Sequence, residues 1–222
     1  MTTSTALTRW LRQGLALGVC PLCRVAHKLD REFIWYFSDE YSAHGEVIDA
    51  LSDAGGFCSE HAEQLRRLEV DGLRSTLGIT LTYLDTLERV ASELDSLRAS
   101  ERFGRAQCPA CAHRAEGVRK NATYLLADID ESERTRARFL SSPGMCLPHF
   151  EQVWAIADGA QRELLLDVQR RALSEVVGAL RKDVERQGSE QCRAWARAIA
   201  LTAGWPAPDR SARVPTAQDG EA

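Results

Sequence analysis

The chain has 222 residues, of which 44% are hydrophobic and 27% are charged, and its formal net charge is −4. This length and composition fit a globular protein with a sizeable core. Neither half of the chain has the excess of Lys and Arg that a nucleic-acid-binding surface requires, and no stretch approaches about 18 consecutive apolar residues, so we expect no nucleic-acid partner and no membrane association.

Apolar residues recur at helical spacing along the whole chain, and the alternating pattern of strands is missing. After His61 a long helical segment carries leucines from Leu65 to Leu94, and the second half has a similar segment from Val153 to Val184. Such stripes predict the core of a helical bundle. In chain order the pattern predicts helices over about 5–18, 21–42 and 45–53, the long segment after 61, a joint at 100–107, a further set of helices to about 188, and a last helix over about 190–202.

One metal-ligand motif occurs twice in the sequence. A CxxC motif is followed 35 residues later by a CxxH motif, and every position of the second set lies 88 residues after its counterpart in the first. The first set is Cys20, Cys23, Cys58 and His61, and the second is Cys108, Cys111, Cys146 and His149. This register indicates an internal duplication.

Three thiolates and one imidazole suit a tetrahedral zinc ion. Pro21 and Pro109 directly follow the first cysteine of each CxxC, where proline fits the first residue of a helix. Two helix N-termini would then meet at each ion, and their dipoles would stabilise its net negative charge. We therefore expect two structural zinc ions per chain, each held within one repeat. Iron–sulfur clusters also accept such ligands and stay an alternative.

These features together predict an all-α fold of two tandem zinc-clamped helical repeats, packed as an elongated helical bundle. The expected segments are an N-terminal helix over 1–19, repeat 1 over 20–100, repeat 2 over 101–188, a C-terminal helix over 189–203 and a disordered tail over 204–222. Six thiols used as metal ligands rather than as disulfides indicate a reducing cytoplasm.

The motif sequences CPLC with GFCSEH, and CPAC with GMCLPH, resemble an uncharacterised family of bacterial proteins, a domain of unknown function with paired CPxC and G-[FLM]-C-x-x-H motifs. The resemblance covers roughly residues 15–185. It implies metal binding and a bacterial source, and it implies no particular activity.

The two repeats differ most at residues 33–37, which read Phe-Ile-Trp-Tyr-Phe, whereas residues 121–125 read Asn-Ala-Thr-Tyr-Leu. Five consecutive bulky residues surround a helix, so they form either a buried central helix or, in part, an exposed surface. On the second interpretation Trp35, Tyr36, Tyr41 and His44 would line the principal groove or partner surface.

No sequence signature of a catalytic site is present, which argues against an enzyme. The preferred function is a zinc-binding adaptor or regulatory module that recognises a protein partner. Two alternatives stay open: a thiol-redox or metal sensor, in which oxidation of a CPxC pair releases the metal, and an iron–sulfur protein or an enzyme with a pocket between the repeats.

Overall fold

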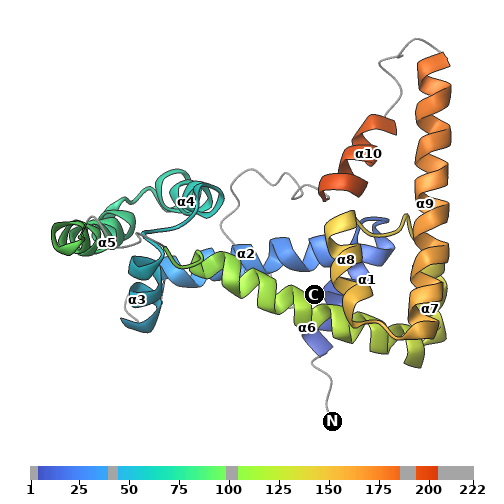
Figure 1. Ribbon diagram of the computed structural model, residues 1–222, viewed down its shortest axis with the longest axis horizontal. Coiled ribbons are helices and arrows are strands. Elements are labelled where there is room, and N and C mark those ends of the chain that lie inside the picture. The colour runs from blue at the N-terminus through green and yellow to red at the C-terminus, as the bar shows by residue number, and fades with distance from the viewer. Residues whose placement is uncertain (1–4, 40–44, 99–104, 186–193, 205–222) are drawn as a thin grey trace. The chain divides into compact units, whose positions relative to one another are not determined.

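The computed structural model describes residues 5–39, 45–98, 105–185 and 194–204, and its regular elements in these ranges are all helical (Figure 1). This confirms the predicted all-α class. None of these helices is both long and apolar enough to cross a membrane. In chain order the elements are α1 (Thr5–Ala16), α2 (Pro21–Asp39), α3 (Gly45–Asp53), α4 (Ser59–Arg66), the π-helix η2 (Arg67–Leu73), α5 (Leu77–Ser96), α6 (Pro109–Glu131), α7 (Glu133–Leu140), α8 (Leu147–Ile156), α9 (Gly159–Glu185) and α10 (Ala194–Ala203).

The chain forms two compact units. Unit 1 takes residues 1–27 and 116–208, and the described part of unit 2 lies within residues 28–115. The chain passes from one unit to the other inside α2 and inside α6, so each of these two helices belongs to both units. The units therefore divide the chain differently from the two sequence repeats, because each unit contains residues of both repeats.

An aromatic cluster holds unit 2 together. Phe33 and Phe37 of α2 meet Phe57, with ring centroids 6.4 and 4.9 Å apart and nearly perpendicular ring planes. This edge-to-face arrangement stabilises aromatic pairs beyond the area they bury. Leu51 of α3 and Leu65 of α4 are completely buried in the same cluster. Most of the Phe-Ile-Trp-Tyr-Phe run is therefore core.

Unit 1 is built around α9, which contacts α7, α8 and α10. Its core contains Leu11 of α1, Leu125 and Ile129 of α6, Phe139 of α7, Val153 of α8, Leu165 and Val168 of α9, and Leu201 of α10, all at most 1% exposed. A polar contact ties α1 to α6, since Arg12 donates to Asp128 at 2.9 Å between Nη2 and Oδ1. The hydroxyl of Thr135 donates to the same carboxylate at 2.9 Å.

The leucine stripe of repeat 1 is not bundle core along its whole length, contrary to the sequence-based prediction. Leu65 is buried, but the leucines of α5 are exposed. The predicted long helix is interrupted by η2 and by Arg74, which has the left-handed φ of 54°. The α5 face that packs inward carries Thr82 and Thr86. Helical periodicity alone cannot tell which of two apolar faces is covered.

Candidate metal centres

The eight Cys and His residues of the duplicated motif gather into two groups of four, and the ligand atoms of each group lie within 4.8 Å of one another. Both groups are geometrically able to hold a metal ion. Centre A consists of Cys20, Cys23, Cys146 and His149, and centre B consists of Cys58, His61, Cys108 and Cys111.

The predicted pairing within each repeat is wrong, because each centre combines the CxxC of one repeat with the CxxH of the other. The length of α2 favours this exchange. Its 19 residues carry the chain about 28 Å away from Cys20. The nine residues of α3 span only about 13 Å, so α3 alone does not bring Cys58 back to that point. The spacing of the motifs identifies the eight ligands, but it does not reveal which CxxC shares a centre with which CxxH.

In centre A three sulfur atoms and one imidazole nitrogen lie close to one another, as the four corners of a tetrahedron would. His149 Nδ1 lies 3.1 Å from Cys146 Sγ, 3.3 Å from Cys23 Sγ and 3.5 Å from Cys20 Sγ. The sulfur atoms of Cys146 lie 3.5 and 3.9 Å from those of Cys23 and Cys20. A zinc tetrahedron with ordinary bond lengths has S–S edges of roughly 3.8 Å and S–N edges of roughly 3.5 Å. The separations therefore fit a four-coordinate ion.

Centre B has the same arrangement with His61 Nδ1 at one corner. The nitrogen lies 3.2 Å from Cys58 Sγ, 3.4 Å from Cys111 Sγ and 3.7 Å from Cys108 Sγ. Cys58 Sγ and Cys111 Sγ are 3.7 Å apart. A metal with these four ligands has no open coordination position, which is typical of a structural site.

Each centre receives the N-terminal ends of two helices: α2 and α8 meet at centre A, and α4 and α6 meet at centre B. Cys58 and Cys146 are the N-cap residues of α4 and α8 and have extended backbones, with φ of −63° and −67°. Neither thiol caps the backbone of its own helix, so both are directed to the cluster. The helix N-termini place partial positive charge beside the thiolates and favour the ionised ligands.

The glycine of the G-x-C-x-x-H motif has a backbone role. Gly56 and Gly144 are 88 residues apart, and both have positive φ, 105° and 80°. A Cβ at Gly144 would also lie 2.9 Å from Gln169 Oε1. Gln169 holds the residue after this glycine, since its Oε1 accepts from Met145 N at 3.0 Å and its Nε2 donates to Met145 O at 2.9 Å. Gln169 carries no sequence signal that marks it for this role.

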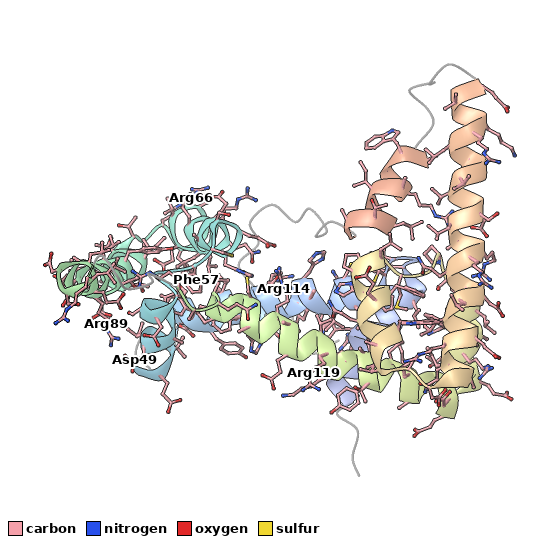
Figure 2. The ribbon with its side chains drawn as sticks, in the orientation of Figure 1. Asp49, Phe57, Arg66, Arg89, Arg114 and Arg119 are labelled. Atoms are coloured by element: carbon pink, nitrogen blue, oxygen red, sulfur yellow. The ribbon has the colours of Figure 1, made fainter. Side chains whose placement is uncertain are left out.

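Centre B has polar partners behind its histidine. His61 Nε2 lies 3.1 Å from Asp30 Oδ1, and both side chains are buried. Arg114, which is labelled in Figure 2, donates from Nη1 to Asp30 Oδ2 at 3.1 Å and to Glu60 Oε1 at 3.2 Å. A carboxylate that accepts the Nε2 proton fixes the ring and leaves Nδ1 for a metal. Burial lowers the pKa of His61, but hydrogen bonds with Asp30 and Cys58 and the neighbouring negative charges together outweigh it and raise the pKa of the imidazole to about 9.

Centre A lacks this network. The positions that correspond to Asp30, Arg114 and Glu60 in the other repeat are Val118, Ala26 and Pro148. Sequence reasoning missed these polar partners, although comparing the repeats at an offset of 88 residues would have revealed the substitutions. The two centres therefore have equivalent ligands but different surroundings.

Access to solvent also differs between the centres. In centre A the three thiols are at most 4% exposed and the histidine is partly exposed, whereas in centre B the histidine is fully buried and Cys58 and Cys111 are partly exposed. Burial opposes ionisation of Cys58, but hydrogen bonds from His61 and from Cys111 lower the pKa of its thiol to about 7. At centre A, Gly204 lies at the end of α10, where a Cβ would be 3.5 Å from Cys23 Sγ. The end of α10 thus lies against the buried sulfurs.

The predicted partner surface is only partly described. Tyr36 is 43% exposed and Trp35 is half-buried, whereas Tyr41 and His44 lie outside the described residues. In the described part of the chain, open surface depressions of about 390 and 320 Å³ lie on other elements. The first is lined by residues of α9, and the second includes Arg12 and Thr135. Neither is lined by Trp35 or Tyr36, and the expectation that these aromatics line the principal groove or partner surface stays a prediction.

Residues 16–186 match the model of a family of unknown function, DUF6062. The chain belongs to this family. No curated protein and no solved structure matches the chain significantly. The family match covers both centres with all eight of their ligands, and the function must be inferred from those centres.

Proposed function

We propose that this DUF6062 protein is a zinc-stabilised helical module that recognises another protein, with one structural zinc ion in each centre. The supporting observation is the tetrahedral spacing of three sulfurs and one Nδ1 at the meeting point of two helix N-termini from different repeats. Six thiolate ligands also favour a reducing compartment such as the cytoplasm.

The ligand chemistry favours zinc over the alternative of an iron–sulfur cluster. The sulfur and nitrogen atoms lie as close together as the corners of a single-ion tetrahedron, with Sγ–Nδ1 separations from 3.1 to 3.7 Å. A cluster of several irons needs its ligands farther apart, because each ligand binds a different iron atom. Elemental analysis of protein purified without chelators tests this proposal. Two zinc ions per chain and a colourless solution are expected, and a brown solution containing iron would overturn it.

A second candidate function, thiol-redox sensing, is favoured by the partly exposed sulfurs of centre B. Cys58 Sγ and Cys111 Sγ lie 3.7 Å apart. With hydrogen peroxide as oxidant, one thiolate attacks the O–O bond and becomes a sulfenic acid as hydroxide leaves. The other thiolate then attacks the sulfenic sulfur, forms the disulfide and expels a second hydroxide. The zinc ion loses two ligands and leaves.

Limited treatment with peroxide distinguishes sensing from a purely structural role. The sensor hypothesis expects one zinc ion to be released first, together with a Cys58–Cys111 disulfide identified by peptide mass spectrometry. The buried thiols of centre A serve as the internal control, because access governs thiol oxidation. Equal rates of oxidation at both centres would exclude a sensor based on centre B.

A further inference from the structure

The outer face of α5 carries an exposed strip of leucines. Leu77, Leu81, Leu84, Leu87 and Leu94 are between 51% and 65% exposed. Isolated exposed leucines are ordinary, but a continuous strip along one helix is typical of an interaction surface. We call these five residues the leucine face.

The leucine face cannot turn inward, because the opposite face of α5 is fixed to unit 2. Thr82 and Thr86 are buried there. Arg89 of α5 forms an ion pair with Asp49 of α3 (Figure 2). The hydroxyl of Ser52 donates to Asp85 on the same side. The rotation of α5 is thus set by contacts within unit 2, and the leucines point away from them.

The spacing of the leucine face fits another helix. Leu77, Leu84 and Ala91 follow one another at seven-residue intervals, and Leu87 and Leu94 come three residues after the last two. These are the a and d positions of a heptad repeat, the pattern that packs side chains of one helix between those of a second. Among the a and d positions of α5, Thr80 is the one polar residue.

We propose that the leucine face binds the leucine face of a second copy of this chain, with the two α5 helices antiparallel. Aligning Leu84 with Leu87 of the second copy places Leu77 opposite Leu94 of that copy. The same alignment repeats in the other direction, as a two-fold symmetric interface requires. The strip is therefore complementary to itself.

The charges of α5 select the antiparallel orientation. Residues 77–84 carry no charge, whereas residues 85–96 carry four acidic side chains and one basic side chain. A parallel pair would bring the two acidic halves together. An antiparallel pair places each acidic half beside the uncharged, positive-dipole end of the other helix.

In the proposed dimer, the acidic half of α5 (residues 85–96) has an oppositely charged partner, Arg74 of the other copy. Arg74 is exposed at the end of η2, three residues before α5 begins, and forms none of the ion pairs found among the described residues. In the antiparallel alignment Arg74 of one copy approaches Asp95 of the other. In a parallel pair these two residues would be separated by about 30 Å, the length of the helix.

This inference names a partner for the proposed interaction module and rests on that function, but it does not depend on which metal is bound.

Sedimentation velocity of the metal-loaded full chain from about 1 to 500 μM tests it. A reversible dimer is expected. Changing Leu84→Glu and Leu87→Glu together should weaken the dimer at least about 100-fold, since two buried leucines are lost and two charges are added. The metal content of each sample shows separately whether the zinc proposal holds.

Two further sets of variants sharpen the test. Val177→Glu with Val184→Glu places two charges on exposed apolar positions of α9 and should leave the dimer unchanged. Arg74→Asp should weaken the dimer, Asp95→Arg should weaken it, and the two changes combined should restore it. Aspartate tolerates the left-handed backbone of Arg74. A wild-type monomer at all concentrations, a dimer indifferent to the leucine changes, or failure of the charge exchange to restore pairing would each overturn the proposal.

Discussion

Asp30 Oδ1 lies 3.1 Å from His61 Nε2, whereas the residue that corresponds to Asp30 in the second repeat is Val118. One histidine ligand therefore has a buried carboxylate behind it and the other does not. Carboxylates in this position orient the imidazole and increase its basicity as a ligand. The duplicated motif thus produced two centres with the same ligands and different supports.

Changing Asp30→Ala should weaken zinc binding at centre B by about 10- to 100-fold and leave centre A unchanged. Competition with a coloured zinc chelator measures both affinities. Glu32→Ala is the matched control, because Glu32 lies on the same helix and forms an ion pair with the partly exposed Lys28 rather than with a metal ligand. A change in centre A, or an equal effect of Glu32→Ala, would contradict the assigned role of Asp30.

Pairs of ligand substitutions should reveal the exchange between repeats. Cys23→Ser with His149→Ala affects centre A alone, so the chain should keep one zinc ion and lose little more stability than with either change alone. Cys23→Ser with His61→Ala affects both centres, so no zinc ion should remain. Elemental analysis and thermal melting measure both results. If the second pair of changes keeps one ion, each repeat binds its own metal.

Gly144→Ala should destabilise the fold by about 1–3 kcal/mol, because a side chain is strained at positive φ and its Cβ would crowd Gln169. Gly178→Ala is the control. It lies within α9 with no atom within 4 Å of the added Cβ, and the change should stabilise the fold by about 0.5–1 kcal/mol. Chemical denaturation measures both. Effects of the same sign at the two glycines would refute the backbone argument.

Asp128→Asn should cost about 1 kcal/mol of stability, since it weakens the contact of α1 with α6. The hydrogen bond from Arg12 lowers the pKa of Asp128 below its usual value in the folded protein. A lowered folded pKa gives stability that is fully present above the unfolded pKa of about 3.9 and is lost as the pH falls through the folded value. The difference in the free energy of unfolding between wild type and Asp128→Asn should therefore be constant from pH 8 to pH 5. Denaturation curves at several pH values check this, and a difference that changes within that range would contradict it.

Local sequence signals predicted much of the fold. Pro21 and Pro109 marked the starts of α2 and α6, and the register of 88 residues identified every Cys and His in the two centres. These features depend on residues close together in the chain. The pairing of one repeat's CxxC with the other repeat's CxxH depends on the path of the chain between the motifs, to which the length of α2 contributes and which the ligand spacing does not express.

Other features escaped prediction because they depend on tertiary context. The leucines of α5 are exposed although they recur at the helical spacing of a buried stripe, whereas Phe33 and Phe37 belong to the core, as one of the two interpretations expected. Asp30 and Gln169 are ordinary polar residues until the fold buries them beside a centre. Burial of a polar side chain becomes visible only when its partners are known.

The exchanged ligand sets also impose an order on folding during synthesis. Centre B is complete once Cys111 has left the ribosome, but centre A must wait for His149, which is 129 residues beyond Cys20. Loop-closure entropy favours the same order, because each doubling of the loop costs about 0.6 kcal/mol and Cys58 and Cys111 are only 53 residues apart. Cys20 and Cys23, the first ligands made, therefore wait longest for their partners, and the nascent chain presents an unfilled pair of metal ligands until His149 has emerged.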